Sequence, residues 1–357
     1  MARKQPEKTA LILNCAPPGV DTEPLWEGFV SSALKRYTAL FTLNASDILD
    51  CSPANVFKVT DGGDDISARP VLFPRLHSQH HIREHGAPLL SLLASLNYPD
   101  LYVCGDFDAV RLAARLALWC RENTVQGNWT VIPCCPLNSV PFTDINPGFG
   151  SALAYCTAIG ADLLQTCQRN AMTSPVGLLH IRDDHYGWLS AGTAALLSRK
   201  LPVLCILPDQ TCDRQALAKA LWTSLAKYSV VLIILGESPA PETPTTVSHF
   251  IEKTFQCRVA TQCVQPRALI PSAYCARQDR KLSAAAGRAA VRLGRAARQH
   301  ILVVNRFKPG SAASLDFLAT PLLEAVHAVR RPPDAWYRPK TLKVSNTLAD
   351  MLSGFTR

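Results

Sequence analysis

The chain is poor in charge and in aromatic residues, and it has no long hydrophobic run. Charged residues make up 18% of the 357 residues and aromatic residues 7%, and the charged share is below the roughly 25% usual in soluble proteins. Hydrophobic residues nevertheless reach 48%, which provides a large core and excludes a long disordered chain or a fibrous array. The apolar run Val230–Leu235 is strand-sized and falls far short of the ~20 residues that span a bilayer.

Signals for export and for disulfide bonding are also missing. Met1–Lys8 is polar and charged and does not favour a signal peptide, so we expect a cytoplasmic protein without a membrane partner. Cys134 and Cys135 are adjacent, which is neither a zinc-ligand spacing nor a redox motif. Seven further cysteines stand singly in apolar surroundings and are expected to be reduced and mostly buried: Cys15, Cys51, Cys104, Cys120, Cys156, Cys205 and Cys263.

The net charge of +9 suits an anionic partner. Basic residues crowd the stretch 277–308, where Arg288, Arg292 and Arg295 fall on one helical face. A solvated helix face is the simpler interpretation. A nucleic-acid surface is the alternative, but the stretch lacks the interleaved aromatic residues on which bases stack.

Short apolar runs alternate with segments of helical periodicity. Strands are expected at 10–14, 100–104, 130–133, 176–181, 202–207 and 230–235. Helices are expected at 109–121, 151–169, 188–199, 216–226 and 249–255. This alternation predicts parallel sheets with helices on both faces, and such sheets bind ligands at the carboxyl ends of their strands.

Four strand-end loops, at 14–21, 104–108, 132–152 and 182–191, carry polar residues and glycines. The sequence of 132–152, IPCCPLNSVPFTDINPGFGSA, resembles the IPKTIDNDIPFTD…GFDTA segment of the phosphofructokinase family, most closely in its pyrophosphate-dependent branch. The segment 185–191 resembles the end of that family's MGRxxGWLAA motif. Shorter matches are Leu207-Pro208-Asp209, Gly236-Glu237, and Asp279 followed by 286–291.

The resemblance implies an α/β protein with two Rossmann-like three-layer α/β/α domains of the phosphofructokinase fold and a cleft between them. Residues 1–145 with roughly 265–300 would form the donor-side domain, and 146–264 with roughly 301–357 the sugar-phosphate side. It also implies a pyrophosphate or ATP donor, fructose 6-phosphate as acceptor, magnesium and a homo-oligomer.

Carried over position by position, the resemblance assigns two groups of binding residues. The donor would contact Cys15, Gly19, Gly105, Asp106 and Asp108, with Asp106 as the magnesium ligand. The sugar phosphate would contact Asn138, Arg182, Asp209 and Arg267.

The catalytic positions of the family are not conserved in this chain. Leu137 occupies the position of the general base, Ser139 that of a second aspartate, and Asp184 that of a phosphate-binding arginine. Phe107 and Cys15 replace glycines of the donor loops. General acid–base assistance alone is worth about 10²–10⁴ in rate, so the sequence predicts lost or very low phosphotransferase activity and a regulatory or structural role in binding phosphorylated metabolites or partners.

Two alternatives remain open. An active phosphotransferase of this fold would use a rearranged site with Asp106, Asp108, Asp184 and His185 handling magnesium and protons. The second alternative is a basic nucleic-acid-binding protein on the same fold.

Histidines form a separate cluster, His77, His80, His81 and His85. His77, His81 and His85 would share a helical face, and a histidine pair at this spacing can bind zinc. An exposed polar segment is the simpler interpretation. Asp183-Asp184-His185 offers a further carboxylate–histidine arrangement.

Overall fold

The computed structural model describes residues 8–44, 48–60, 64–69, 71, 78–125, 127–208, 213–237, 243–297, 299–308 and 311–356. The chain divides into two compact units. Unit 1 comprises Met1–Cys135, Val140–Gly148 and Arg280–Val329, and unit 2 comprises Pro136–Ser139, Phe149–Asp279 and Arg330–Arg357. This division differs from the expected one, because 301–329 belongs to unit 1 and 265–279 to unit 2.

Unit 1 contains a seven-stranded sheet in the order β11-β10-β5-β4-β1-β2-β3. The strands are β1 (Thr9–Cys15), β2 (Ala39–Leu43), β3 (Val56–Lys58), β4 (Asp100–Gly105), β5 (Trp129–Pro133), β10 (Ile301–Lys308) and β11 (Ser311–Pro321). Strands β10, β5, β4, β1 and β2 run parallel, whereas the edge strands β3 and β11 are antiparallel to their neighbours. Strands β2 and β3 lie on one side of β1, and β4, β5, β10 and β11 lie on the other. The direction in which strands are added therefore reverses between β1 and β4, which is a topological switch point.

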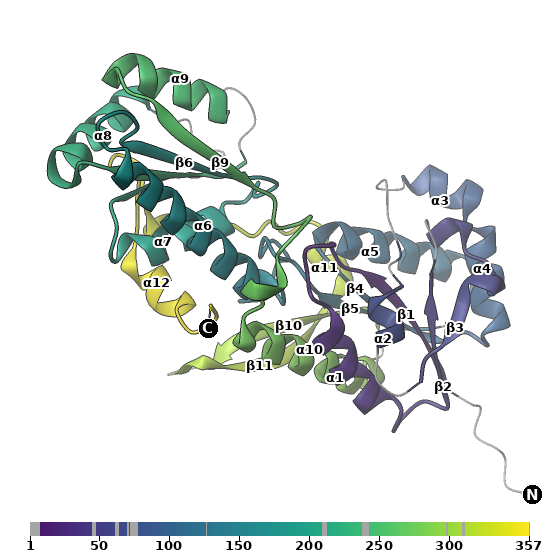
Figure 1. Cartoon of the computed structure of the whole chain (residues 1–357). Coiled ribbons are helices and arrows are strands. Elements are labelled where there is room, and N and C mark those ends of the chain that lie inside the picture. The colour runs from purple at the N-terminus through teal and green to yellow at the C-terminus, as the bar shows by residue number, and fades with distance from the viewer. Residues whose placement is uncertain are drawn as a thin grey trace, which may run out of the picture. The chain divides into compact units, whose positions relative to one another are not determined.

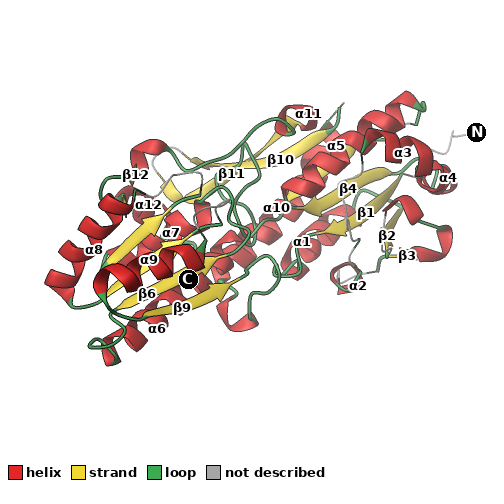
Figure 2. Ribbon diagram, turned by 90° about the horizontal axis from the view of Figure 1, so that it is seen from above, coloured by secondary structure: helices red, strands yellow, loops and turns green. Residues whose placement is uncertain are grey.

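The helices of unit 1 cover both faces of this sheet (Figure 1). They are α1 (Glu23–Ala33), α2 (Asp64–Ser67), α3 (Gln79–His85), α4 (Ala87–Ser95), α5 (Phe107–Glu122), α10 (Arg277–Ala296, which begins in unit 2) and α11 (Leu322–Ala325), with the short 3-10 helices Ile48–Asp50 and Pro53–Asn55. Alternate residues of each strand face opposite sides, so Ile12 and Tyr102 join the core beneath α1 and α10. Helices α1 and α10 lie side by side in both views (Figure 2).

Glycines allow α1 and α10 to approach this closely. A Cβ on Gly287 would lie 2.1 Å from the Leu25 carbonyl oxygen, and one on Gly28 would lie 2.2 Å from the Ala284 carbonyl oxygen. The backbones of the two helices are therefore in direct contact at this crossing.

Unit 2 contains a parallel four-stranded sheet in the order β7-β8-β6-β9. The strands are β6 (Val176–Ile181), β7 (Val203–Ile206), β8 (Val231–Leu235) and β9 (Val259–Val264). Helices α6 (Phe149–Arg169) and α7 (Trp188–Ser198) cover one face, and α8 (Arg214–Tyr228) and α9 (Pro244–Phe255) cover the other (Figure 1). The unit also holds the hairpin β12 (Tyr337–Arg338)–β13 (Lys343–Val344), α12 (Asn346–Leu352), and the 3-10 helices Ser272–Tyr274 and Asp334–Trp336.

The structure confirms the expected α/β class and every strand and helix predicted from periodicity. The histidine segment forms α3, in which the rings of His81 and His85 stack with centroids 4.5 Å apart, while His77 lies outside the described residues. No helix among the described residues is long and apolar enough to cross a membrane. One cysteine differs from expectation: Cys263 is exposed, although it remains a free thiol like the other described cysteines.

Candidate functional site

The loops expected to bind the phosphoryl donor begin at the switch point of the unit 1 sheet. Cys15 and Gly105 are paired across β1 and β4, so the loops that follow them start side by side. A Cβ on Gly105 would lie 2.3 Å from the Cβ of Ala109 and 2.9 Å from the Cys15 carbonyl oxygen. Gly105 is therefore required for the turn into α5, whether or not a ligand binds there.

Asp106 is the N-cap of α5. Its Oδ1 accepts hydrogen bonds from the backbone N–H groups of Asp108 and Ala109, at 3.0 and 3.4 Å. Phe107 is buried at the start of the same helix, where the Arg111 guanidinium lies 4.8 Å from its ring centroid. The Asp106 carboxylate thus has a clear structural role at a helix N-terminus.

The side chains near Asp106 do not fit a magnesium site built by the protein. Within the part of the chain that the structure describes, no three His, Cys, Asp or Glu side chains come together as metal ligands. Asp106 offers a single carboxylate that already caps a helix. Magnesium held by one such carboxylate would have to take its remaining ligands from water and substrate phosphates.

The loop after β1 is likewise held by contacts within the protein. Burial raises the pKa of the Cys15 thiol well above its usual value, and the nearby Asp106 carboxylate raises it further. The Asn14 amide donates to the Ile66 carbonyl at 3.3 Å. Gly19 lies in a turn closed by a 3.0 Å hydrogen bond from Val20 N–H to the Pro17 carbonyl. A partly buried thiol with a raised pKa therefore stands where the resemblance places a glycine of the donor loop.

The PFTD segment, which carries much of the family resemblance, is bound to β10. Asn305 donates from its backbone N–H to Thr143 Oγ1 at 3.1 Å and from its side-chain amide to the Ile145 carbonyl at 2.6 Å. The Asp144 carboxylate accepts from Phe307 N–H at 2.7 Å and from the Arg306 guanidinium at 3.1 Å. This part of the motif positions the loop on the sheet.

Leu137 lies in the short segment Pro136–Ser139 of unit 2, which follows β5. Its exposure is 8%, and the next residue, Asn138, is fully buried with a φ of 55°. The Arg330 guanidinium donates to the Asn138 carbonyl at 2.6 Å and stacks on Trp188 with 4.0 Å to the ring centroid. Ser139 is also buried, so the segment is fixed from both its backbone and its side chains.

Asp184 caps α7. Its exposure is 0%, and its carboxylate accepts hydrogen bonds from the N–H and hydroxyl of Ser190, each at 2.7 Å, and from the Leu189 N–H at 3.4 Å. Burial raises the pKa of this carboxyl, while the hydrogen bonds from Ser190, Leu189 and Gly187 oppose the rise. Asp184 is a structural carboxylate and has no open face for magnesium or a substrate.

Polar side chains gather at the carboxyl ends of β6, β8 and β9. The Glu237 carboxylate lies 3.5 Å from His180 Nε2 and accepts from the Asp183 N–H at 3.2 Å. Gln265 donates to the Asp183 carboxylate at 2.9 Å. His180 Nδ1 lies 3.5 Å from the sulfur of Cys263, and burial lowers the pKa of His180, although Glu237 opposes this. The result is a connected polar network at the edge where ligands bind to parallel sheets.

Arg182 is exposed directly after β6, and Arg267 lies half-buried in the turn after β9. Because β6 and β9 are hydrogen-bonded neighbours, the two arginines belong to adjacent strand ends. His185 is exposed in the same loop as Arg182, whereas Asp209 lies outside the described residues. The structure thus brings Arg182 and Arg267 to one edge of unit 2 but buries Asn138 beneath Arg330.

Comparison with known proteins supports one fold. The structure resembles the pyrophosphate-dependent phosphofructokinase of Nitrosospira multiformis with a TM-score of 0.82, over 98% of this chain and 92% of that one, at 14% identity. The corresponding enzyme of Marinobacter aquaeolei gives a TM-score of 0.81 over 98% and 91% of the two chains at 15% identity. Pichia pastoris phosphofructokinase gives 0.69 at 15% identity, over 91% of this chain and 38% of that one. The chain has the phosphofructokinase fold.

Sequence comparison gives a local match only. A segment of 114 residues, 30% of the chain, is 29% identical to the pyrophosphate–fructose 6-phosphate 1-phosphotransferase of Halomonas elongata, and it covers 26% of that protein. No family model matches the chain. The resemblance to phosphofructokinases inferred from the strand-end motifs is confirmed. The structural likeness covers 98% of the chain, whereas the sequence match covers 30%.

Sequence reasoning missed two features of this phosphofructokinase-fold chain. Arg330 was not predicted because its acceptor is the backbone carbonyl of a residue 192 positions away, and no local pattern marks such a contact. The His180–Cys263 pair joins adjacent strands in register. A polar residue in the otherwise apolar run of β6 was the only signal for it.

The Cys263 thiol provides a test of the strand-end network. Burial raises its pKa, Arg182 lowers it, and Glu237 and Asp183 raise it. We expect Glu237→Gln to lower this pKa and to speed alkylation of Cys263 by iodoacetamide at neutral pH roughly threefold, the effect of a partly exposed charge pair. Peptide mass spectrometry over a pH series measures the rate, and Arg182→Ala should slow it.

Cys257 is an internal control for that experiment. Its pKa is raised by burial and by Glu252, so Glu237→Gln should leave its alkylation rate unchanged. An unchanged rate at Cys263 would show that Glu237 does not act on this thiol.

Proposed function

We propose that this phosphofructokinase-fold protein has lost ordinary phosphotransferase activity and binds phosphorylated metabolites in a regulatory or structural role. The observation that carries the proposal is Leu137, which stands at the family's general-base position and is buried in a segment held by Arg330. An aliphatic side chain cannot accept the proton of a sugar hydroxyl.

The surroundings of Asp184 add support. The resemblance places a phosphate-binding arginine at this position, and this chain has a carboxylate that caps α7. A carboxyl group cannot supply the positive charge that pairs with phosphate, and an arginine could not replace it without burying an unpaired cation at a helix N-terminus.

Several missing groups would each raise the free-energy barrier to phosphoryl transfer. A general base contributes roughly 3–5 kcal/mol to lowering a barrier. Positioning and charge stabilisation account for most of phosphoryl transfer, and the donor-side residues Cys15 and Phe107 offer neither. Such losses are not additive, but all of them act in the same direction.

Binding groups are retained at the carboxyl ends of the unit 2 strands. Arg182 and Arg267 supply positive charge on neighbouring strand ends, and guanidinium groups suit phosphate oxygens. Glu237 and Gln265 supply a hydrogen-bond acceptor and an amide that suit sugar hydroxyls. A phosphorylated sugar therefore fits this edge better than a ligand without charge.

Nucleic-acid binding has less support. On α10, Arg292 donates to the Phe317 carbonyl at 3.4 Å and Arg295 to the Arg36 carbonyl at 3.1 Å. Two of the three arginines of the basic face thus have contacts within their own unit. The homo-oligomer implied by the resemblance stays a prediction.

A coupled assay with fructose 6-phosphate, magnesium and either pyrophosphate or ATP tests the proposal. We expect turnover well below about 1 s⁻¹, the low end of typical enzymes, together with stabilisation by fructose 6-phosphate in thermal unfolding that Arg267→Ala reduces. Faster turnover would establish the rearranged active site instead. Leu137→Asp with Ser139→Asp should not restore activity, and the matched Leu137→Asn with Ser139→Asn separates the effect of charge from that of packing.

A further inference from the structure

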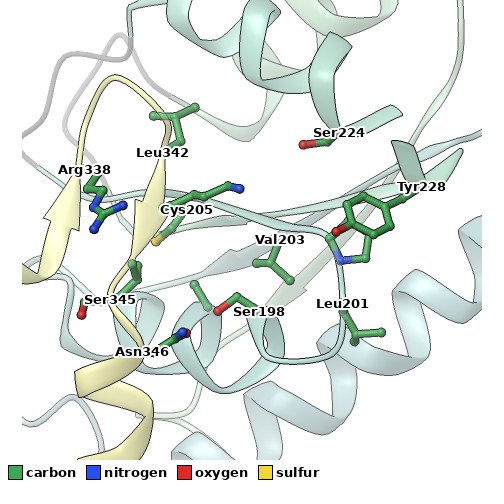
Figure 3. Close-up of a pocket in the computed structure, with 14 residues that line it drawn as sticks. Ser198, Leu201, Val203, Cys205, Ser224, Tyr228, Arg338, Leu342, Ser345 and Asn346 are labelled. Carbon is green, nitrogen blue, oxygen red and sulfur yellow. The ribbon is translucent and has the colours of Figure 1, made fainter. Parts of the chain in front are cut away.

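A cavity of about 410 Å³ lies in unit 2, away from the carboxyl ends of its strands (Figure 3). Its floor is made by Leu201 before β7, by Val203 at the start of β7, and by Ser198 at the end of α7. The end of α8 forms one wall and the β12–β13 hairpin the other. The volume lies within the roughly 300–1,000 Å³ of small-molecule sites.

The hairpin wall is held firmly against the edge of β7. Cys205 N–H donates to the Leu342 carbonyl at 2.8 Å, and the Tyr337 hydroxyl donates to the Cys205 carbonyl at 2.9 Å. The side chains of the hairpin are therefore presented to the cavity by a fixed backbone.

Two exposed cations occupy directly opposite positions on this hairpin. Arg338 and Lys343 are directly paired across β12 and β13, and both line the cavity. Like charges at directly opposite positions destabilise a hairpin. Neither side chain forms an ion pair with any residue that the structure describes, so their mutual repulsion is not offset within the protein.

Neutral polar groups complete the lining. Ser224 and Tyr228 lie on the α8 side, and Asn346 follows the hairpin (Figure 3). The side chains of these three residues have no hydrogen bond to the described parts of the chain. The cavity thus combines unpaired positive charge on the hairpin with unused hydrogen-bonding groups on Ser224, Tyr228 and Asn346.

We propose that this cavity binds a small phosphorylated metabolite that carries hydroxyl groups. A phosphoryl group between Arg338 and Lys343 would offset their repulsion, since the guanidinium fork and the ammonium both match phosphate oxygens. The hydroxyls of the ligand would reach Ser224, Tyr228 and Asn346, and its carbon skeleton would cover Leu201 and Val203. The site is separate from Arg182 and Arg267, so it stands independently of the function proposed above.

Calorimetric titration of the full chain with glucose 6-phosphate, inorganic phosphate and glucose tests the assignment. We expect binding of glucose 6-phosphate, weaker binding of phosphate and none of glucose. Arg338→Ala with Lys343→Ala should weaken glucose 6-phosphate binding at least about tenfold, the scale of lost charge-assisted hydrogen bonds. Lys340→Ala is the matched control, because Lys340 is exposed on the same hairpin but does not line the cavity.

Lys343→Glu gives a second readout that does not depend on calorimetry. It replaces the repulsion with a cross-strand ion pair, so the melting temperature without ligand should be unchanged or higher, and the rise on adding glucose 6-phosphate should disappear. Arg267→Ala should leave binding to this cavity intact, which distinguishes it from binding at the strand ends. If the Arg338→Ala/Lys343→Ala variant binds glucose 6-phosphate as tightly as the unaltered chain, or if that chain binds none, the assignment is wrong.

Discussion

Gly287→Ala is expected to lower the free energy of unfolding by about 3–5 kcal/mol, at the upper end of overpacking effects. Helix propensity alone predicts the opposite sign, because alanine is favoured over glycine inside a helix by about 1 kcal/mol. The new methyl group would lie 2.1 Å from the Leu25 carbonyl oxygen and 2.8 Å from the Phe29 nitrogen. Both are backbone atoms of α1, so the clash can be relieved only by moving a whole helix.

Moving α1 would disturb the core of unit 1. Leu25 and Phe29 are fully buried in that core, and the ring of Phe29 packs edge-on against Tyr102 with centroids 4.7 Å apart. Separation of α1 from α10 therefore loses packed apolar surface in addition to the local strain.

Urea unfolding followed by circular dichroism measures this change. Gly354→Ala is the matched control, because a Cβ at Gly354 would meet nothing within 4 Å. The control should change stability by no more than about 0.5 kcal/mol. A neutral or stabilising Gly287→Ala would show that α1 and α10 are farther apart in solution than their backbones are here.

The strands and the contact between α1 and α10 show how far the sequence could predict the fold. Strands with continuous apolar runs were found, and β6 has the predicted bounds Val176–Ile181, because a strand buried on both faces has an unmistakable composition. The edge strand β9 was missed because most of its residues are at least partly exposed. Gly287 was visible as part of a family motif, but nothing in the sequence indicates that its partner is the backbone of α1.

The sequence predicted where the candidate site lies better than it predicted what the residues there do. The strand-end rule led to the loop that carries Arg182 after β6, because that rule depends only on parallel pairing, whereas Glu237 was noted only through the family resemblance. The rule could not show that Asp106 and Asp184 are helix caps, since a carboxylate after a strand looks the same in sequence whether it binds a ligand or N–H groups. Hydrogen-bond geometry decides between these roles.

The capping role of Asp184 predicts a second large effect. Asp184→Ala is expected to lower the free energy of unfolding by about 2–4 kcal/mol, because it leaves buried donors of Ser190 and Leu189 without acceptors. Asp184→Asn should cost less, since its carbonyl oxygen retains part of the bonding. Asp213→Ala is the matched control: Asp213 caps α8 at an exposed site, where loss of a cap costs typically about 1 kcal/mol.

The pH dependence of Asp184→Asn separates the charge of this carboxyl from its hydrogen bonds. Burial raises the pKa of Asp184 in the folded protein above the unfolded value of about 3.9. The folded state then binds the proton more tightly, so the contribution of this group to stability is greatest below the unfolded pKa and declines as the pH rises through the folded pKa. The stability difference between the unaltered protein and Asp184→Asn, measured by urea unfolding, should therefore shrink as the pH is raised from about 4 toward neutrality. A difference that grows over this range would mean that the hydrogen bonds from Ser190 and Leu189 outweigh burial and hold the carboxylate ionised.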